Sequence, residues 1–312
     1  MIKVFIDGGS GTTGLNVRKR LGERSDVSLV VLDEEHRKNA EARKWAIEQS
    51  DVTFLCLPDD AAREAVALAS DSRAVIIDTS TAHRTLDSWA YGFPELEGAR
   101  EKIASSKRIA NPGCHASGFI SLIYPLIKAG AVRKDVSLSC FSLTGYSGGG
   151  KKMIANYEDP ANAEALRAPT MYALGQTHKH LPEMMKICGI NKAPVFCPVV
   201  SSYYAGMQVV VPLTQNETKC GIEEIKDVYR AAYKGGIVRF SETPDENGFL
   251  SSGSFAGKDD MQISVYGNDE RMTLVSRFDN LGKGACGAAI QNMNISLGLP
   301  ENTGLILSED NK

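Results

Sequence analysis

Apolar and polar positions in the first third of the chain follow two alternating patterns. Compact apolar runs predict strands, and the more polar segments between them, with apolar residues at helical spacing, predict helices. The expected strands are residues 2–7, 27–32, 52–57 and 74–78, and the expected helices are residues 15–21, 40–48 and 61–69. Because this alternation favours parallel strands with right-handed crossovers, we expect an α/β, doubly wound, Rossmann-type nucleotide-binding domain.

The pattern changes after about residue 113. Longer strand-like segments follow, with fewer helices between them, at residues 135–143, 195–200, 206–213, 261–266 and 273–278. Successive strands of this kind are typical of a mixed or antiparallel sheet, so we expect a second, α+β domain of mixed sheet. A last helix near residues 285–297 has Ile290, Met293 and Leu297 at helical spacing and could close either domain.

A glycine-rich turn lies between the first strand and the first helix. A pyrophosphate requires a tight turn, close approach of the backbone and free N–H groups at a helix start. The strand before the turn and the helix after it are the required context, so dinucleotide binding is favoured over a plain flexible turn. The residues expected to hold the cofactor here are Gly8, Ser10, Gly11, Thr12, Thr13 and Gly14.

The residues after the second strand bear on the choice of dinucleotide. Asp33 could hydrogen-bond a ribose hydroxyl, which would favour NAD. Arg37 and Lys38 follow closely and could hold a 2′-phosphate; the alternative is that both are solvated surface charges. The two cations lead us to expect NADP(H) as the cofactor.

Cys114 stands apart from the other cysteines because of its position. It follows Asn-Pro-Gly at residues 111–113 and begins an apolar helix that Lys128 and Gly130 terminate. The dipole and the free amides at a helix start favour the thiolate, which is the nucleophilic form of cysteine. Cys114 is therefore a candidate nucleophile. Pro125 within the same helix predicts a kink or a local break.

A thiolate nucleophile needs a proton partner. His178 and His180 are candidates, because unperturbed imidazole titrates near neutral pH, although either could be a surface-loop histidine. With no third ligand nearby, we expect no metal site. The glycine-rich residues 147–150 precede Lys151 and could bring amides and an ammonium group to an anion, or could form a plain hinge.

Charge and composition exclude several classes of protein. The 35 Lys and Arg residues against 38 Asp and Glu give a formal charge of −3, too little positive charge to attract nucleic acid or an anionic membrane. No apolar run approaches the ~20 residues of a spanning helix, and the N-terminus reads as a strand rather than a signal. The odd count of seven cysteines argues against a disulfide framework, and the absence of a Cys-x-x-Cys pattern argues against a thiolate zinc site. We expect a cytoplasmic protein.

Seven blocks along the chain resemble the short class of N-acetyl-gamma-glutamyl-phosphate reductases, in the semialdehyde dehydrogenase superfamily. The resemblance covers essentially the whole chain, and its blocks are residues 8–14, 56–60, 77–84, 111–114, 145–151, 178–183 and 279–285. Aspartate-semialdehyde dehydrogenases are similar, but their cysteine block lacks the Pro-Gly before the cysteine. One departure is His115, where longer members tend to have tyrosine. It leaves the nucleophile assignment intact and adds a third imidazole near the site.

The resemblance implies an activity and a mechanism. The activity is NADPH-dependent reduction of N-acetyl-L-glutamyl 5-phosphate to N-acetyl-L-glutamate 5-semialdehyde and phosphate, in arginine biosynthesis. Cys114 would attack the acyl phosphate and form a thioester, which hydride then reduces. By the family pattern His180 would relay the proton, with His178 as the fallback.

The resemblance also implies binding roles. Arg84 is a candidate for holding the departing phosphate, with a surface arginine as the equal alternative. Lys151 and His178 are further candidates for contacts with the substrate or its phosphate. The remaining residues expected beside the cofactor are Pro58, Ser80 and Asn280.

In this family the last helix returns to the nucleotide domain. The expected domains are therefore residues 1–113 plus 285–312 for NADP binding, and residues 114–284 for catalysis, substrate binding and oligomerisation. Relatives suggest a homodimer or homotetramer that acts on a small acyl phosphate. Two alternatives are an enzyme like aspartate-semialdehyde dehydrogenase and a non-catalytic NADP-binding redox sensor, in which Cys114 is oxidised and not acylated.

Overall fold

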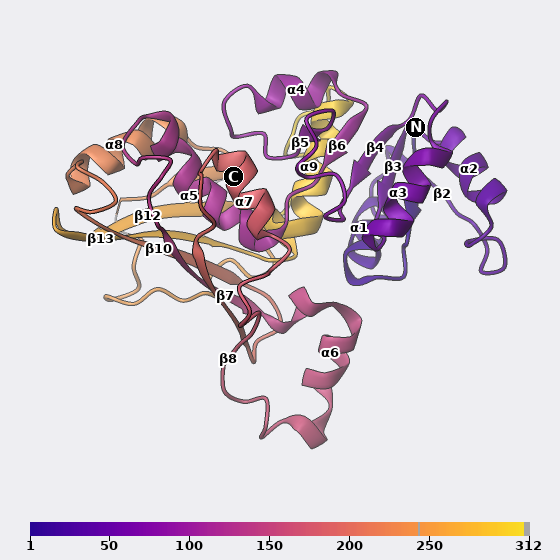
Figure 1. Ribbon diagram of the computed structural model, residues 1–312. Helices are drawn as coiled ribbons and strands as arrows, with labels where there is room; N and C mark the ends of the chain where they lie inside the picture. Colours follow the sequence, from indigo (N-terminus) through magenta and orange to yellow (C-terminus); the bar gives the residue numbers. More distant parts are fainter. Residues whose placement is uncertain (243, 309–312) are drawn as a thin grey trace. The chain divides into compact units, whose positions relative to one another are not determined.

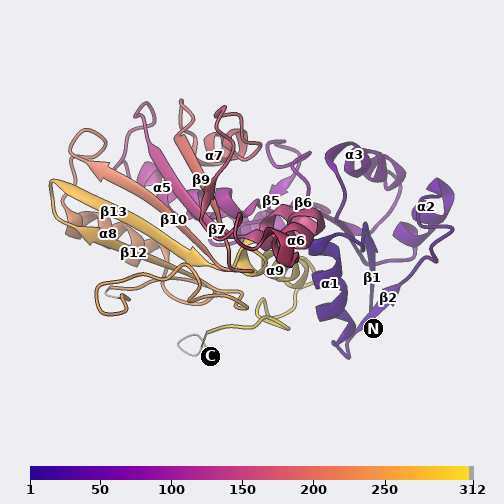
Figure 2. The ribbon, with the colours of Figure 1, turned by 90° about the horizontal axis from the view of Figure 1, so that it is seen from below.

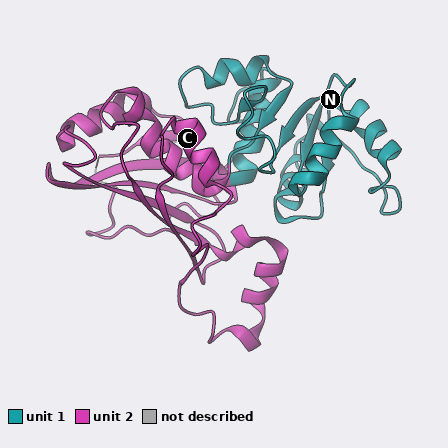
Figure 3. Ribbon diagram, viewed as in Figure 1, with its two compact units in different colours: residues 1–112, 285–305 teal, residues 113–284, 306–312 magenta. Residues whose placement is uncertain are grey.

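Figures 1 and 2 show the computed structural model, which describes residues 1–242 and 244–308. The chain forms two compact units (Figure 3): Met1–Pro112 with Ala285–Leu305 is unit 1, and Gly113–Gly284 with Ile306–Lys312 is unit 2. Gly113 and residues 306–308, which the sequence assigned to the first domain, fall in unit 2. Ile306 and Ser308 are held there by hydrogen bonds to Asp259 and Asp260. The last four residues of the expected first domain, 309–312, lie outside the described residues.

Unit 1 contains a six-stranded sheet in which every strand pair is parallel, in the order β2-β1-β3-β4-β6-β5. Its strands are β1 Ile2–Asp7, β2 Val27–Val30, β3 Val52–Leu55, β4 Val75–Asp78, β5 Ala90–Tyr91 and β6 Arg108–Ala110. Its helices are α1 Thr12–Gly22, α2 Ala40–Glu48, α3 Asp59–Leu68, α4 Ala99–Ser105 and α9 Gly287–Ser296. The predicted α/β class and doubly wound parallel sheet are confirmed.

Helices cover both faces of this sheet, because successive residues of its strands point to opposite faces and both sets are apolar. Val4 and Phe54 pack with α1, α4 and α9 on one face. Their sequence neighbours Phe5 and Leu55 pack with α2 and α3 on the other. Strands buried on both faces are continuous apolar runs, which is why the sequence indicates them clearly. The short elements β5 and α4 were not predicted.

Unit 2 contains a seven-stranded mixed sheet in the order β11-β12-β13-β10-β7-β9-β8. Its strands are β7 Ser139–Gly145, β8 Thr170–Met171, β9 Val195–Ser201, β10 Met207–Thr214, β11 Val238–Phe240, β12 Met261–Gly267 and β13 Arg271–Phe278. Its helices are α5 Cys114–Lys128, α6 Gly150–Glu158, α7 Leu181–Cys188 and α8 Ile222–Ala232. The pairs β7–β9 and β11–β12 are parallel and the others antiparallel, so the predicted mixed sheet is confirmed.

The apolar helix α5 is the central element of unit 2. It lies with α7 and α8 on one face of the sheet (Figures 1 and 2). Gly118 permits its close packing on β10, since a Cβ there would collide with Val209. Nearly every residue of α5 is buried, which fixes the position of its first turn. Within the described part of the chain, no helix is both long and apolar enough to span a bilayer.

Of the kink or local break predicted at Pro125, the break is wrong, because α5 continues without interruption through this residue, and the kink stays a prediction. Proline cannot donate to the carbonyl four residues earlier, which belongs to Ser121. The hydroxyl of Tyr233 donates to that carbonyl instead, at 2.7 Å. Tyr229 of α8 donates in the same way to the next carbonyl, of Leu122, at 2.6 Å. Tyr233 thus replaces the hydrogen bond that Pro125 removes, and Tyr229 adds a second bond to the helix beside it.

Tyr233→Phe is expected to lower the free energy of unfolding by about 1–2 kcal/mol, because the buried Ser121 carbonyl loses its donor. The measurement is urea unfolding followed by circular dichroism. In a Pro125→Ala background the loss should be smaller, since the alanine amide can reach the same carbonyl. Equal losses in the two backgrounds would contradict the assigned role of Tyr233.

Candidate active site

The glycine-rich turn connects β1 to α1. Gly8 has φ +81°, a conformation that favours glycine, and a Cβ there would collide with the main chain of Cys56. The amide of Gly11 donates to the Gly8 carbonyl at 3.1 Å and closes the turn. A Cβ at Gly14 would lie 2.7 Å from the same carbonyl. The glycines therefore form a tight cradle at the start of α1, and this arrangement fits a pyrophosphate.

Two further segments lie at the same carboxyl edge of the parallel sheet. Pro58 precedes α3 just beyond β3, and Ser80 lies just beyond β4. The carboxylate of Asp59 joins these segments by accepting hydrogen bonds from the amide and the hydroxyl of Thr81. Pro58 and Ser80 are thus brought to the edge where the glycine turn lies. Their contacts with the cofactor stay a prediction.

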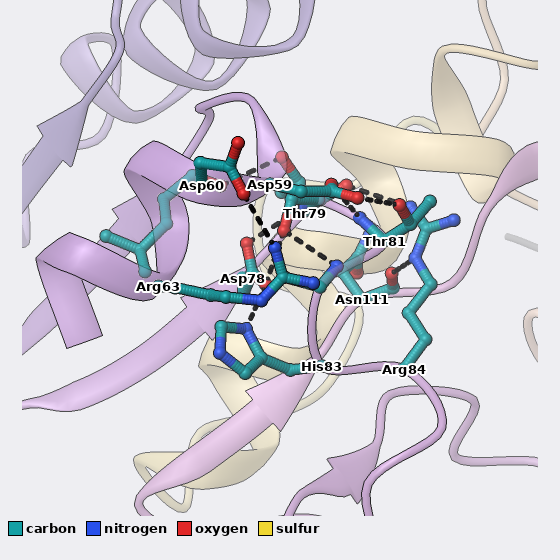
Figure 4. A network of polar contacts seen from close by, with 12 residues as sticks. Asp59, Asp60, Arg63, Asp78, Thr79, Thr81, His83, Arg84 and Asn111 are labelled. Atoms are coloured by element: carbon teal, nitrogen blue, oxygen red, sulfur yellow. Dashed lines mark hydrogen bonds and ion pairs between the residues drawn. The ribbon is translucent and has the colours of Figure 1, made fainter. Parts of the chain in front are cut away.

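The buried carboxylate of Asp78, at the end of β4, organises this edge (Figure 4). It accepts hydrogen bonds from the amide and the hydroxyl of Ser80, at 2.9 and 2.7 Å. Nδ1 of His83 lies 2.6 Å from its Oδ2, and the His83 ring stacks on Trp89 with centroids 4.1 Å apart. Because the Ser80 hydroxyl donates to Asp78, the Ser80 side chain holds the turn after β4 in place.

Arg84 lies at the same turn and is buried, so the alternative of a surface arginine is wrong. Its Nε donates to the carbonyl of Asn111 at 2.9 Å and its Nη2 to the carbonyl of Thr79 at 2.8 Å. Figure 4 shows the side chain between these two segments. Arg84 therefore ties the turn after β4 to the residue after β6. Its contact with a phosphate stays a prediction.

Asp33, Arg37 and Lys38 lie on an exposed turn beyond the end of β2. The Asp33 carboxylate accepts a hydrogen bond from the amide of His36 at 2.9 Å, and the Nδ1 atom of that residue lies 2.7 Å away. These hydrogen bonds lower the pKa of Asp33. Arg37 lies 3.1 Å from the carboxylate of Glu34. Arg37 and Lys38 are therefore accessible from solvent.

Cys114 is the first residue of α5, with Gly113 as its extended N-cap residue. The residue is partly exposed. By contrast Cys140 and Cys188 are buried, and burial raises the pKa of both thiols. A partly exposed cysteine at a helix start has the position of a reactive cysteine, whereas the buried thiols have that of core residues.

Two other segments pack against this helix start. The carboxylate of Glu183, in the first turn of α7, accepts a hydrogen bond from the Gly113 amide at 2.9 Å. The π-helical turn Gly282–Cys286 lies beside Cys114: a Cβ on Gly284 would come within 2.9 Å of the Cys114 Cβ. Glycine at position 284 therefore leaves the room that the cysteine needs.

The two predicted histidines and His115 form one cluster in unit 2. The ring centroids of His178 and His180 are 4.7 Å apart. The centroid of the His115 ring lies 5.4 Å from that of His178 and 5.6 Å from that of His180. His180 is the N-cap residue of α7, one helical turn before Glu183. The bond from Glu183 to Gly113 therefore joins the start of the helix that carries His180 to the start of the helix that carries Cys114.

The histidines of the cluster differ in their hydrogen bonds. His178 accepts the main-chain N–H of His180 at its Nδ1 atom, at 3.1 Å, and burial lowers the pKa of His178 to about 4. His115 has Ser142 at Nδ1 and Tyr172 at Nε2, and burial lowers its pKa to about 3. Both rings are neutral at neutral pH, as expected for imidazoles removed from water.

The other predicted residues of unit 2 lie in different environments. Asn280 is buried; its side chain accepts from the amide of Gly206 at 3.0 Å and donates to Ser147 at 2.9 Å. Lys151 is exposed in the first turn of α6. The glycine run before it includes Gly150, with φ +75°. The ligand contacts predicted for Asn280 and Lys151 stay predictions.

Four residues of the site were not predicted from the sequence: Ser142, Tyr172, Glu183 and Gly284. Glu183 and Gly284 fall in blocks that carry the resemblance, so their position in those blocks was a usable signal. Ser142 and Tyr172 lie in segments with no motif. Only the sheet, which pairs β7 with β9 and β9 with β8, brings them to His115.

Comparison with protein families places both units in one class. Residues 3–106 match the semialdehyde dehydrogenase NAD binding domain, and residues 114–280 match the semialdehyde dehydrogenase dimerisation domain. The second match covers more than half of the chain. The chain is therefore a semialdehyde dehydrogenase-type protein, and the predicted binding of a nicotinamide dinucleotide is confirmed.

Individual relatives identify the family within this class. The chain is 42% identical to N-acetyl-gamma-glutamyl-phosphate reductase 2 of Nostoc sp., with 97% of this chain and 99% of the relative covered. It is 43% identical to the N-acetyl-gamma-glutamyl-phosphate reductase of Sinorhizobium medicae, with 95% and 98% covered. The chain belongs to the N-acetyl-gamma-glutamyl-phosphate reductase family, as the sequence blocks predicted.

Solved structures agree on the fold. Aspartate semialdehyde dehydrogenase II of Vibrio cholerae, in complex with ASA, has a TM-score of 0.72 at 16% identity and covers 96% of this chain and 98% of its own. The Candida albicans aspartate semialdehyde dehydrogenase with NADP has a TM-score of 0.67 at 13% identity, covering 96% and 99%. At these identities the likeness concerns the fold alone.

Gly14→Ala is expected to weaken NADPH binding about tenfold or more, since a strained turn costs on the order of 1–3 kcal/mol. The dissociation constant is measured by NADPH fluorescence. Gly22→Ala is the matched control in the same helix, because a Cβ there meets nothing closer than 3.8 Å. Unchanged affinity in the Gly14 variant would show that the cradle is not the cofactor site.

His115 is expected to make unit 2 sensitive to acid. Its folded-state pKa lies below that of the unfolded chain, so its stabilising effect is complete above pH 6.5 and is lost as the pH falls towards about 3. Between pH 6 and 4 the loss approaches about 1.4 kcal/mol per pH unit. Urea unfolding at several pH values should show a smaller slope for His115→Gln than for wild type; equal slopes would contradict the assignment.

Proposed function

We propose that this protein reduces N-acetyl-L-glutamyl 5-phosphate to N-acetyl-L-glutamate 5-semialdehyde and phosphate with NADPH, using Cys114 as the nucleophile. The observation that carries the proposal is the partly exposed cysteine at the start of α5, beside an imidazole cluster, in a chain of this reductase family. The comparisons give the family and the class of cofactor. The roles of individual residues are supported by the geometry of the site.

The covalent route begins with the Cys114 thiolate. Its sulfur attacks the acyl carbon, a C–S bond forms, and the C–O bond to phosphate breaks with the electron pair leaving on phosphate. The glycine cradle after β1 would hold NADPH, whose chemistry would be the supply of hydride for reduction of the resulting thioester. The thiohemiacetal oxygen then gives up its proton, the C–S bond breaks, and the aldehyde leaves with the sulfur again a thiolate. A thioester suits this route because it is electrophilic and its thiolate is a good leaving group.

His180 is the proposed acid and base of these steps. The resemblance to the reductase family points to His180, which lies in the same cluster as His115 and His178. His180 is held beside the helix start of Cys114 through Glu183. It is therefore the imidazole best placed to protonate the substrate oxygen and to take that proton back. His178 then contributes to substrate binding.

NADP(H) is the form of the cofactor that the turn after β2 favours. An NAD site needs a carboxylate for the ribose hydroxyls. The Asp33 carboxylate already accepts hydrogen bonds from its neighbour His36. Arg37 and Lys38 are exposed on the same turn and supply the positive charge that a 2′-phosphate requires.

A second copy of the chain is the proposed partner, in a homodimer or a homotetramer built from such dimers. The dimerisation-domain match of residues 114–280 supports it. One sheet face of unit 2 is covered by α5, α7 and α8 (Figure 2). The other exposes apolar side chains, among them Phe141 of β7 and Val195 of β9. Seven reduced cysteines and the use of NADPH favour the cytoplasm as the compartment.

Cys114→Ser is expected to lower turnover by at least about 10³-fold while NADPH still binds, because a serine hydroxyl at a helix start is not ionised. The assay follows NADP-dependent oxidation of N-acetyl-L-glutamate 5-semialdehyde, which should require phosphate or arsenate. Cys220→Ser, at another partly exposed cysteine, is the control and should retain normal turnover.

Near-normal activity of the Cys114 variant would remove the nucleophile assignment. Absence of phosphate-dependent oxidation in the wild-type protein would remove the reaction class. A higher kcat/KM on aspartate semialdehyde than on the N-acetylated semialdehyde would favour the aspartate-semialdehyde dehydrogenase alternative. A substrate-derived thioester trapped on Cys114 would argue against a redox sensor.

A further inference from the structure

The segment that carries His178 and His180 is attached to β9 through the side chain of Gln176. Its Nε2 donates to the carbonyl of Phe196 at 2.7 Å, and the Phe196 amide donates to its Oε1 at 2.8 Å. One side-chain amide thus bonds both main-chain groups of a strand residue, as a neighbouring strand would. His178 follows two residues later, and its ring meets the ring of Phe196 with centroids 5.1 Å apart.

The Gln176 side chain takes the place of a strand that ends early. β8 pairs with β9 in an antiparallel register that puts Met171 opposite Val199, so residue 174 would lie opposite Phe196 if the strand continued. The chain leaves this register at Ala173, whose φ of +53° lies in the left-handed region. Gln176 therefore supplies the two bonds that a longer β8 would make to β9 at this position.

Gln176 itself is held in a conformation that glutamine seldom adopts. Its φ is +56°, and its main-chain amide closes the turn by donating to the Ala173 carbonyl at 3.1 Å. A left-handed φ on a residue other than glycine costs free energy and persists only where the surroundings stabilise it. The two bonds to Phe196 are such a stabilising contact, so the side chain of Gln176 fixes the turn from which the histidines follow.

The anchored segment leads directly into the candidate site. The Nδ1 atom of His178 accepts the amide of His180 at 3.1 Å, and His180 is the N-cap residue of α7. In the first turn of that helix, Glu183 accepts the amide of Gly113 at the start of α5. The histidines thus lie between two anchors, Gln176 on β9 and Glu183 at the start of α5.

We propose that Gln176 is a positioning residue for the reaction at Cys114. Its two bonds to Phe196 hold the segment with His178 and His180 in place. The inference rests on the proposed function, in which His180 is the acid and base. Loss of these bonds releases the segment from β9, because the other contacts of the turn are local, and leaves the sheet and unit 1 intact.

Gln176→Met removes the amide and keeps the length of the side chain. The test measures carbethoxylation of His180 by diethyl pyrocarbonate at neutral pH, with the tryptic peptide that begins at His180 quantified by mass spectrometry. His180 is buried in the wild type, so we expect modification about tenfold faster in the variant, since two hydrogen bonds no longer oppose release of the segment. Gln215→Met, in an exposed turn after β10, is the control and should leave the rate unchanged. His83, buried in unit 1, is the reference within each sample.

Turnover tests the consequence for the reaction. In Gln176→Met, kcat/KM on N-acetyl-L-glutamate 5-semialdehyde should fall about tenfold, while the NADPH dissociation constant stays that of wild type because the cradle lies in unit 1. Gln176→Asn separates the bonds from the backbone conformation. Asparagine suits a left-handed φ better, but its amide is one methylene too short to bond Phe196, so this variant should behave as Gln176→Met does. Thermal unfolding followed by circular dichroism confirms that each variant is folded.

An unchanged rate of His180 modification in Gln176→Met would overturn the anchoring role. A wild-type rate in Gln176→Asn would overturn the role of the bonds to Phe196, because the turn would then depend on its backbone conformation. Faster modification with unchanged kcat/KM would overturn the positioning role in the reaction. Failure of the proposed function would be seen separately, as a wild-type protein in which His180 modification depends on Gln176 but which lacks phosphate-dependent oxidation of the semialdehyde.

Discussion

The hydrogen bond between the buried Glu183 carboxylate and the Gly113 amide is the contact on which the candidate site of unit 2 depends. It satisfies a donor at the start of α5 with an acceptor from the start of α7, and each helix carries one of the proposed catalytic residues at that end. Cys114 follows Gly113 directly, and His180 precedes Glu183 by one helical turn. A carboxylate removed from water is costly unless hydrogen-bonded, so the two helix starts stay together.

In unit 1, a buried carboxylate organises the carboxyl edge of the sheet. Asp78 ends a strand with a completely buried carboxylate, and its bonds to Ser80 and His83 fix the turn that follows. Arg84 then ties this turn to the main chain of Asn111. A polar network of this kind is stabilising when its members have partners, because the low dielectric strengthens each bond. The network therefore holds the turn after β4 in place at the edge of the sheet where the cofactor is expected to bind.

The sequence predicted those features that depend on neighbouring residues. Strand runs, the glycine turn and the helix start at Cys114 are local patterns, and all three lie where expected. The features it did not predict join residues far apart in the chain. The bond between Glu183 and Gly113 spans 70 positions, that between Tyr172 and His115 spans 57, and that between Tyr233 and Ser121 spans 112. The last explains why the expectation of a break at Pro125 was wrong: the rule holds for an isolated helix, and a tyrosine from another element supplies the missing donor.

Three imidazoles within 6 Å of one another place a limit on the charge that the catalytic half can hold. Each proton that one ring binds disfavours protonation of the others. His115 is bonded at both nitrogens and His178 at one, and burial lowers the pKa of both rings to well below neutral pH. The proposed reaction moves one proton on to the substrate oxygen and one off it again. With His115 and His178 neutral, neither of these two rings competes for that proton.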